Sequence, residues 1–230
     1  MRAARLHAVG DLRVADEPVP DGSGPGMRLV RVTAVGICGS DLHGWDEGAI
    51  GDAKLTHPLV LGHEGAGVIA EGPRAGQRVA IDPAIPCETC RACRDGYRNL
   101  CYRLKFSGHG DTDGMMREFM AWPTTALHPL PDRVSDADGA MLEPLGVAIH
   151  SVDLGHLPFG GTASVIGCGP IGGEAGLGSS EGGTFIALTP RGSVRASRTA
   201  AGVPSPSFVR LPTVRSRSRR ARPRHGHHGR

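Results

Sequence analysis

Apolar and polar residues alternate in several short stretches of the first 130 residues. The clearest stretch is Met27–Val35, whose period of two predicts a half-buried β-strand. Other β-rich stretches, several of them bounded by glycine or proline, are Ala3–Val9, Leu12–Ala15, Gly62–Glu71, Arg78–Ile81 and Met116–Trp122. The spacing of these segments predicts a small, barrel-like β domain.

The pattern changes after residue 130. Ser135 precedes a run of small and acidic residues, which predicts a helix start, and Pro144 suits the first position of a second helix that ends near Val152. Ala163–Gly173 is an apolar strand followed by a glycine turn, as at the start of an α/β unit. In the remaining sequence only Thr184–Leu188 has the composition of a strand.

The charge is distributed unevenly along the chain. Residues 1–175 contain 15 Lys and Arg against 22 Asp and Glu, whereas residues 176–230 contain 11 Arg and a single acid, Glu181. An acidic body is therefore followed by a basic tail. Met1–Gly10 has no apolar signal core, and no run of 18 apolar residues occurs, so we expect a cytoplasmic protein that does not contact a membrane.

Four of the six cysteines are crowded in the pattern Cys87-x2-Cys90-x2-Cys93-x7-Cys101. Without an export signal, such crowding favours metal binding over disulfides. Four thiolates complete a tetrahedral zinc shell and leave no position for water or substrate, which indicates a structural site. An iron–sulfur cluster also uses four cysteines, but this spacing differs from the usual ferredoxin run.

A second set of candidate metal ligands is divided between two segments. Cys38 closely follows the predicted strand Met27–Val35, and His63 and Glu64 lie further along the chain. One thiolate, one imidazole and one carboxylate suit a catalytic zinc, which has about three protein ligands and one open position. Each residue alone has an ordinary explanation, because a lone histidine is usually structural and Cys38 would fit as a small buried hydrophobe. Their occurrence together with a four-cysteine loop favours a metal site.

Gly167, Gly169 and Gly172 form a GxGxxG pattern directly after an apolar strand. The pattern is weak evidence by itself, but the preceding strand is the context that a dinucleotide-binding turn requires. Glycines at these positions permit a tight turn and allow a pyrophosphate to approach a helix N-terminus. The segment therefore predicts the start of a cofactor-binding unit.

Taken in order, five motifs resemble those of the zinc-dependent medium-chain alcohol and polyol dehydrogenases, in particular the sorbitol and threonine dehydrogenase subgroup. These motifs are GxCGSDxH (Gly36–His43), GHExxGx with a following aliphatic residue (Gly62–Ile69), the four-cysteine pattern (Cys87–Cys101), Glu-Pro (Glu143–Pro144) and GxGxxG (Gly167–Gly172). The resemblance covers nearly all of residues 1–173. It implies a GroES-like β domain with one catalytic and one structural zinc ion, followed by a Rossmann domain that binds NAD or NADP.

The resemblance also implies roles for the individual metal ligands. Cys38 and His63 match the ligands of the catalytic zinc, and Glu64 matches a carboxylate that binds zinc directly or supports a ligand. Glu143 matches the carboxylate that polyol and threonine dehydrogenases have where ordinary alcohol dehydrogenases have a cysteine. Its alternative role is that of a helix N-terminal acid stabilised by the helix dipole.

Ser40 and His43 match the proton relay of the family. Oxidation of an alcohol removes a proton from oxygen and a hydride from carbon. The proton would pass to Ser40 and then to His43, which can titrate near working pH, and the nicotinamide would accept the hydride. The implied partner is a small alcohol, polyol, sugar or amino alcohol, and members of the family are usually homo-oligomers.

After Gly173 the sequence departs from the family. Gly173–Ser180 is too rich in glycine and serine for the expected helix, and Leu188–Arg191 lacks the acid that would bind the ribose. We therefore expect a GroES-like domain over residues 1–152, an incomplete Rossmann segment over 153–190 and a disordered basic tail over 191–230. The composition of the tail favours a reading frame translated out of phase, with a genuine basic extension as the alternative. We expect little or no dehydrogenase activity from this chain.

Two other functions compete with that of an enzyme. A nucleic-acid-binding protein would use the four-cysteine loop as a scaffold and the tail as a phosphate-binding arm. The arginines that surround the loop favour this alternative: Arg91, Arg94, Arg98 and Arg103. The acidic body argues against nucleic acid as a partner. A catalytically inactive dehydrogenase-like partner would have the same fold and differ only in turnover.

Overall fold

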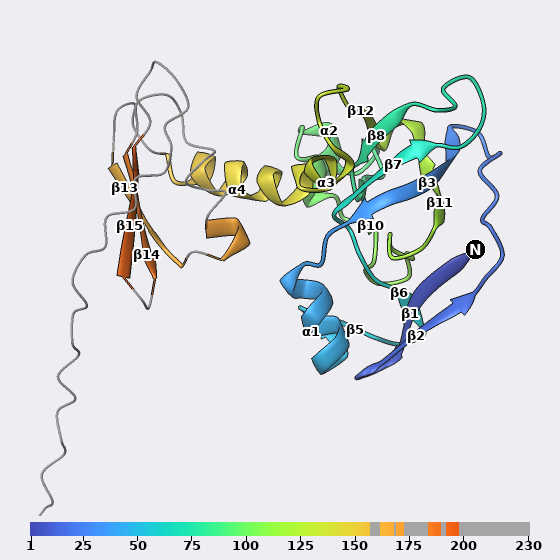
Figure 1. Ribbon diagram of the computed structural model, residues 1–230, viewed down its shortest axis with the longest axis horizontal. Coiled ribbons are helices and arrows are strands. Elements are labelled where there is room, and N and C mark those ends of the chain that lie inside the picture. Colours follow the sequence, from blue (N-terminus) through green and yellow to red (C-terminus); the bar gives the residue numbers. More distant parts are fainter. Residues whose placement is uncertain (157–161, 168, 173–183, 190–191, 198–230) are drawn as a thin grey trace, which may run out of the picture. The chain divides into compact units, whose positions relative to one another are not determined.

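The computed structural model describes residues 1–156, 162–167, 169–172, 184–189 and 192–197 (Figure 1). The chain divides into two compact units, Met1–Val147 and Ala148–Arg230. The division falls inside helix α4 (Leu142–Leu154), a few residues before the boundary that the sequence predicted at residue 152. Among the described residues, no helix combines the length and the apolar character needed to cross a membrane.

An antiparallel sheet of five strands forms the centre of the first unit, in the order β11-β3-β7-β8-β12. Two of these strands, β3 and β8, have the predicted bounds. The five strands are β3 (Met27–Val35), β7 (Gly65–Ile69), β8 (Arg78–Ile81), β11 (Phe119–Pro123) and β12 (Leu127–Pro129). This β-rich architecture confirms the predicted β domain.

The hydrophobic core of this unit lies against the five-stranded sheet. Alternate residues of its strands point to the same side, as the period-two pattern predicts. The buried members of this cluster are Val30, Ile69, Val79, Ile81, Met115, Met120, Trp122, Ala126 and Leu127. A smaller cluster of Leu6, Leu59 and Leu61 packs beneath a second sheet.

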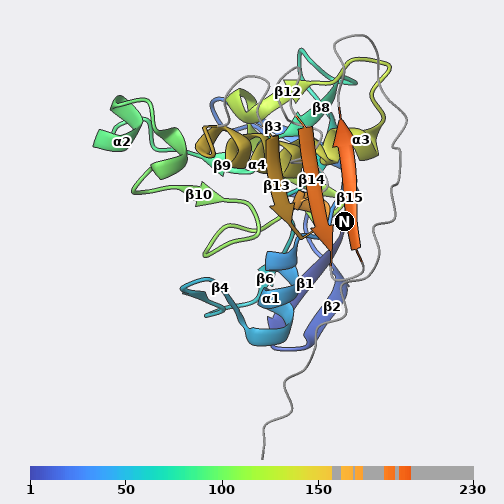
Figure 2. The same cartoon turned by 90° about the vertical axis from the view of Figure 1, so that its left-hand side faces the viewer.

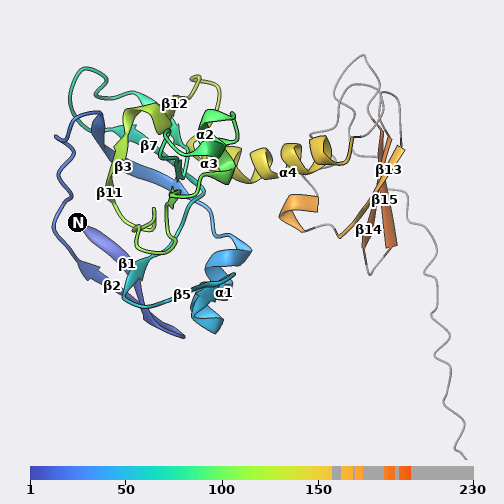
Figure 3. The same cartoon turned by 180° about the vertical axis from the view of Figure 1, so that it is seen from behind.

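The second sheet joins the amino terminus to the segment before the candidate ligands. It consists of β2 (Asp11–Asp16), β1 (Arg2–Ala8) and β6 (Leu59–Val60), and Figure 3 shows the β1–β2 hairpin beside the N-terminus. Arg5 of β1 forms ion pairs with Glu17 and Asp113, each at 2.8 Å. Hydrogen bonding to Arg5 lowers the pKa of Glu17. Burial by itself would raise the pKa of Asp113, but the hydrogen bonds from Arg5 and Val60 leave it lowered.

The remaining elements of the first unit are short. Two antiparallel ladders have only two residue pairs each: β4 (Ala49–Ile50) with β5 (Ala53–Lys54), and β9 (Ala84–Ile85) with β10 (Lys105–Phe106). The helices are α1 (Gly39–Glu47), α2 (Arg91–Arg94) and α3 (Asp136–Ala140). Two 3₁₀ turns are η1 (Arg98–Leu100) and η2 (Thr124–Ala126). The sequence analysis did not predict α1 or α2. Helix α3 follows Ser135 as predicted, and the Ser135 hydroxyl accepts a hydrogen bond from the Asp138 amide. Helix α4 begins two residues before Pro144, which therefore does not occupy the predicted first position.

Three strands of the second unit form one sheet. β13 (Thr162–Ile166) pairs in parallel with β14 (Thr184–Thr189), as strands of an α/β unit do. β15 (Gly192–Ser197) runs antiparallel to β14, and Figure 2 shows its arrow opposed to the other two. β15 lies in the segment that was assigned to the basic tail, where the sequence did not predict a strand. Backbone ladder bonds hold β15, and its serine-rich sequence gave little apolar signal. The rest of the predicted tail, residues 198–230, lies outside the described residues.

Candidate functional site

Cys38, His63 and Glu64 lie together at one end of the central sheet. β3 ends at Val35 and β7 begins at Gly65, and these two residues are paired directly across the ladder. The ladder therefore brings the segment that follows β3 beside the segment that precedes β7. One ligand atom from each of the three residues lies within 4.8 Å of the other two.

This three-ligand group has the chemistry and the spacing of a zinc site. Zinc ligands at about 2.0–2.3 Å from the ion lie about 3.3–3.8 Å from one another in a tetrahedral shell. The observed limit of 4.8 Å requires only a small inward movement of the side chains. His63 and Glu64 are buried and Cys38 is half-buried. Because three ligands leave one position open, the group fits a catalytic metal site rather than a closed one.

Asp41 connects the two segments that supply these ligands. Its carboxylate accepts hydrogen bonds from the backbone amide of Cys38 at 2.9 Å and from that of Gly62 at 3.0 Å. It also lies 3.7 Å from Nδ1 of His63 and is only 2% exposed. Asp41 was not among the predicted site residues, although its position three residues after Cys38 is that of a helix-capping acid. Since Asp41 faces Nδ1, the Nε2 atom of His63 is left to bind metal.

Glycine at position 36 makes room for the buried carboxylate. The Gly36 amide donates to the carbonyl of Glu64 at 2.7 Å. A Cβ built on Gly36 would overlap the Glu64 carboxylate. Gly62, directly before His63, has a φ of 98°, a conformation that L side chains rarely adopt. Gly36 is therefore required by the space around the ligands, and Gly62 by the backbone conformation.

The two predicted relay residues have different environments. The Ser40 hydroxyl lies 3.4 Å from Nε2 of His63, which places it beside the metal-binding nitrogen. His43 lies one turn further along α1, where its side chain is 65% exposed and its Nδ1 is 2.9 Å from the Glu47 carboxylate. Ser40 is thus close to the three-ligand group, whereas His43 is at the solvent-exposed surface of α1.

The four cysteines of the loop also converge. The ligand atoms of Cys87, Cys90, Cys93 and Cys101 lie within 4.8 Å of one another, and none of these cysteines is in a disulfide. The Sγ atom of Cys90 is 3.5 Å from that of Cys93 and 4.0 Å from that of Cys101. These separations agree with the spacing of about 3.8 Å between thiolates around a tetrahedral zinc. The loop therefore fits a closed, structural zinc site.

Local hydrogen bonds prepare this loop for a cation. The Thr89 amide lowers the pKa of the Cys87 thiol to about 5, whereas burial raises the pKa of Cys93 to about 12. The Cys101 sulfur accepts hydrogen bonds from the amides of Cys87 at 3.2 Å and Arg103 at 3.4 Å. Amide donors directed at sulfur stabilise thiolates, and metal binding would release the protons that remain.

The predicted cofactor turn is described only in part. Gly167 has a φ of 100°, and a Cβ on Gly172 would overlap the Gly167 carbonyl. Both positions therefore require glycine, whereas a Cβ on Gly169 would meet no atom within 4 Å. Residues 170–172 are helical. Cys168 and residues 173–183, where the sequence predicted a poor helix, lie outside the described residues, as do the predicted strand end at residues 190–191 and its Arg191.

Glu143 is not part of the group of ligand atoms. It lies in the first turn of α4, which also agrees with its alternative role as an acid near a helix N-terminus. Among the described residues, the three-ligand group consists of Cys38, His63 and Glu64 alone. Direct metal binding by Glu143 therefore stays a prediction.

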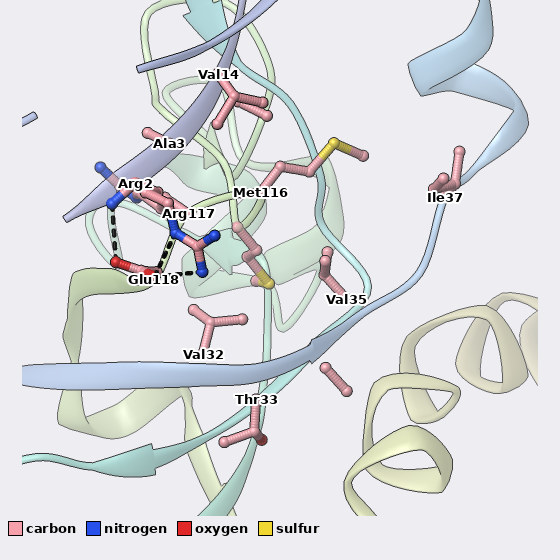
Figure 4. A pocket seen from close by; sticks show the side chains of 13 residues that line it. Arg2, Ala3, Val14, Val32, Thr33, Val35, Ile37, Met116, Arg117 and Glu118 are labelled. Atoms are coloured by element: carbon pink, nitrogen blue, oxygen red, sulfur yellow. Dashed lines mark hydrogen bonds and ion pairs between the residues drawn. The ribbon is translucent and has the colours of Figure 1, made fainter. Parts of the chain in front are cut away.

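An open cavity of about 450 Å³ lies beside β1, β2 and β3 (Figure 4). The Arg2–Glu118 ion pair, at 2.9 Å, contributes charged side chains to its lining. No predicted site residue lines this cavity, so it does not coincide with the three-ligand group. Most of its lining is apolar and includes Val14, Val32, Val35, Ile37 and Met116.

Comparison with known proteins agrees with the geometry of the first unit. Residues 24–132 match the family model of the alcohol dehydrogenase GroES-like domain. The probable D-xylulose reductase A of Neosartorya fischeri is 39% identical over 173 residues, which is 73% of this chain and 48% of that protein. The chain therefore spans about half the length of the curated relatives that it matches.

Solved structures of dehydrogenases have the same fold. L-idonate 5-dehydrogenase of Escherichia coli superimposes with a TM-score of 0.73 and 29% identity, over 83% of this chain and 58% of that one. A protein of Sinorhizobium meliloti described as a putative zinc-binding dehydrogenase, solved with bound NADP, has a TM-score of 0.71 and 32% identity, over 82% of this chain and 56% of that one. The similarity thus extends to solved structures of dehydrogenases, one of them with a bound dinucleotide.

Proposed function

We propose that this chain, which belongs to the zinc-dependent medium-chain alcohol and polyol dehydrogenase family, has the metal site for oxidation of a secondary alcohol of a small polyol, with NAD or NADP as hydride acceptor. The observation that supports this proposal most directly is the convergence of Cys38, His63 and Glu64 within 4.8 Å. A thiolate, an imidazole and a carboxylate with an open fourth position suit metal-assisted alcohol chemistry.

In this proposal the two metal sites have different tasks. Cys38, His63 and Glu64 would hold a catalytic zinc, and the four-cysteine loop would hold a structural one. When bound, the catalytic zinc supplies Lewis-acid chemistry that makes an alcohol hydroxyl easier to deprotonate. The Asp41 carboxylate lies 3.7 Å from Nδ1 of His63, so Nε2 of the same ring would be the atom that binds the metal.

Ser40 and His43 would remove the proton. The Ser40 hydroxyl, 3.4 Å from Nε2 of His63, is close enough to the metal ligands to accept a proton from the substrate hydroxyl. The Glu47 carboxylate accepts from Nδ1 of His43, which leaves Nε2 of His43 as a proton acceptor. Because the His43 side chain is exposed, it can return the proton to water.

Two further groups complete the proposal. Glu143 would add a carboxylate to the catalytic site, as the resemblance to polyol dehydrogenases implies. Gly167, Gly169 and Gly172 would let the cofactor pyrophosphate approach the backbone, and NAD or NADP supplies the hydride acceptor. We further propose a cytoplasmic location, since the five described cysteines are all free thiols and such clusters persist in reducing compartments.

The polyol class is inferred from the relatives. D-xylulose reductase is named for a ketose and L-idonate 5-dehydrogenase for a sugar acid, and both compounds carry several secondary hydroxyl groups. A nucleic-acid function is less well supported. Arg98 forms an ion pair with Glu88 at 2.6 Å, and Arg91 forms one with Asp95 at 3.5 Å. These ion pairs reduce the positive charge that is available to phosphates.

Metal analysis and a metal-substituted protein test the proposal. The purified chain should contain two zinc ions, and Cys38→Ser should remove one of them. In protein reconstituted with Co²⁺, addition of a five-carbon polyol such as xylitol should change the absorption bands of the three-ligand site, because the open position accepts a hydroxyl. A single zinc ion per folded chain, or cobalt bands that do not respond to any polyol, would contradict the proposal.

A further inference from the structure

Phe106 packs directly against a ligand of the three-ligand group. The ring centroids of Phe106 and His63 are 5.4 Å apart, and the ring planes are tilted by 54°. On its other side Phe106 meets the ring of His109 edge-on, at 6.5 Å. The two nitrogens of His63 face Asp41 and Ser40, so Phe106 adds an apolar restraint to a ring whose polar atoms face other groups. Such a contact limits the rotation of the imidazole.

The segment around Phe106 is fixed to the segment around His63. The Ser107 hydroxyl, fully buried, donates to the carbonyl of Gly62 at 3.0 Å. Gly108 lies so close to Gly62 that a Cβ on Gly108 would come within 3 Å of its backbone. The two backbones therefore move together, and a shift of residues 106–108 would be transmitted to His63.

The same segment is the carboxyl-terminal end of the cysteine loop. Phe106 lies in β10, which pairs with β9 over only two residue pairs, Lys105 with Ile85 and Phe106 with Ala84. All four loop cysteines lie between these strands, and Figure 2 shows the loop with α2 extending beyond β9 and β10. A ladder of two pairs has little stability by itself. The ends of the loop are held by this ladder, by the Ser107 amide, which donates to the carbonyl of Pro83 at 3.0 Å, and by the cysteines, with Cys87 and Cys101 in contact through an amide–sulfur bond of 3.2 Å.

We propose that Phe106 is a positioning residue for His63, and that through it the four-cysteine site and the three-ligand site are thermodynamically coupled. This inference rests on the proposed function, since it requires a metal at both groups. Metal in the cysteine loop fixes the β9–β10 ladder, the ladder fixes Phe106, and Phe106 holds the His63 ring in the orientation that binds metal. By linkage, metal at either site then favours metal at the other by the same factor.

A cobalt titration of the metal-free chain tests the positioning role. The first equivalent should produce the strong charge-transfer bands of a four-thiolate site, and the second should produce the weaker bands of a site with one thiolate. Phe106→Ala should weaken the second binding step by about tenfold or more, the loss typical of residues that orient a metal ligand. Phe106→Tyr, which keeps the ring, should retain the parent affinity in the second binding step. Tyr102→Ala is the matched control, since this nearby ring is 71% exposed.

The coupling is tested by a double-mutant cycle on the second binding step. Cys90→Ser should weaken cobalt binding at the three-ligand site when Phe106 is present and should have no further effect in Phe106→Ala. The four-thiolate bands of Phe106→Ala report whether the variant folds. If these bands are absent, Phe106→Leu replaces it and should show the same decrease in the affinity of the second binding step. Equal second-step affinities in the parent and the Phe106 variants would overturn the inference. A parent that binds no second metal would instead contradict the proposed function.

Discussion

Asp41 offers the sharpest test of how the three-ligand site is built. Asp41→Asn keeps the size and shape of the side chain but replaces one carboxylate oxygen by an NH₂ group. In the parent, both oxygens accept from backbone amides, those of Cys38 at 2.9 Å and Gly62 at 3.0 Å. In the variant one of these amides faces another donor, and the buried position gives it no water as a substitute partner.

The size of the effect follows from this loss. Leaving a buried donor unsatisfied costs about 1–3 kcal/mol. For a domain of this size, about 1 kcal/mol lowers the melting temperature by roughly 2–4 °C, so a loss of about 1–3 kcal/mol predicts a decrease of roughly 2–12 °C. Because Asp41 bonds to the backbone of both ligand segments and lies beside His63, the affinity of the three-ligand site for metal should fall by about 10–100-fold.

The assay compares Asp41→Asn with Asp46→Asn, an exposed acid on the same helix. Thermal unfolding of the zinc-loaded proteins gives the change in stability, and competition with a chromophoric chelator gives the affinity of each zinc step. We expect a lower melting temperature and weaker zinc binding in Asp41→Asn alone, and the decrease in zinc affinity should lie mainly in the second, weaker binding step. Equal melting temperatures and equal zinc affinities for both variants would refute the role assigned to Asp41.

Three further predictions use other parts of the site. Gly36→Ala should displace the neighbouring carboxylate ligand and remove one of two zinc ions, whereas Gly39→Ala, whose Cβ meets no atom within 4 Å, should retain both in metal analysis. Cys90→Ser should lower the melting temperature more than Cys38→Ser, because a closed zinc site contributes folding free energy directly; equal values would contradict this. Arg5 lowers the pKa of its two carboxylate partners, so the stability that they contribute is complete above the unfolded-state pKa of about 4 and is lost as the pH falls through the lowered values. Arg5→Met should flatten the decrease of the urea midpoint below about pH 5, and an unchanged pH dependence would exclude this network.

The sequence was most informative where a pattern is local. Met27–Val35 and Arg78–Ile81 were predicted with their observed bounds, because alternation and flanking glycines or acids define a strand within a few residues. The four-cysteine group was equally accessible, since all its ligands lie in one loop. Cys38 and His63 were weaker candidates by residue type alone, because only the β3–β7 ladder brings them together, and the motif resemblance strengthened them.

The remaining features depend on contacts that no local pattern encodes. Helix α1 was missed because Gly39–Glu47 contains two glycines and little apolar periodicity, and its start is determined by the cap that Asp41 forms with Cys38. The role of Phe106 becomes visible only when β10 is placed against His63. β15 was missed because ladder bonds to β14 override a weak strand propensity.

Burial identifies the three-ligand site without any reference to motifs. Among the described residues, the buried polar and charged side chains are Asp41, His63, Glu64 and Ser107. Two of them are candidate metal ligands, Asp41 bonds to the backbone of both ligand segments, and Ser107 fastens the Phe106 segment to the carbonyl of Gly62. Burying such groups costs free energy unless they are hydrogen-bonded, paired or bound to a metal. Their concentration at one place in the core therefore indicates a specific set of hydrogen bonds or metal contacts there. Polar burial would not identify the cysteine loop, because thiols are readily buried and part of the loop is exposed. Motif spacing and polar burial are therefore independent criteria, and at His63 and Glu64 they agree.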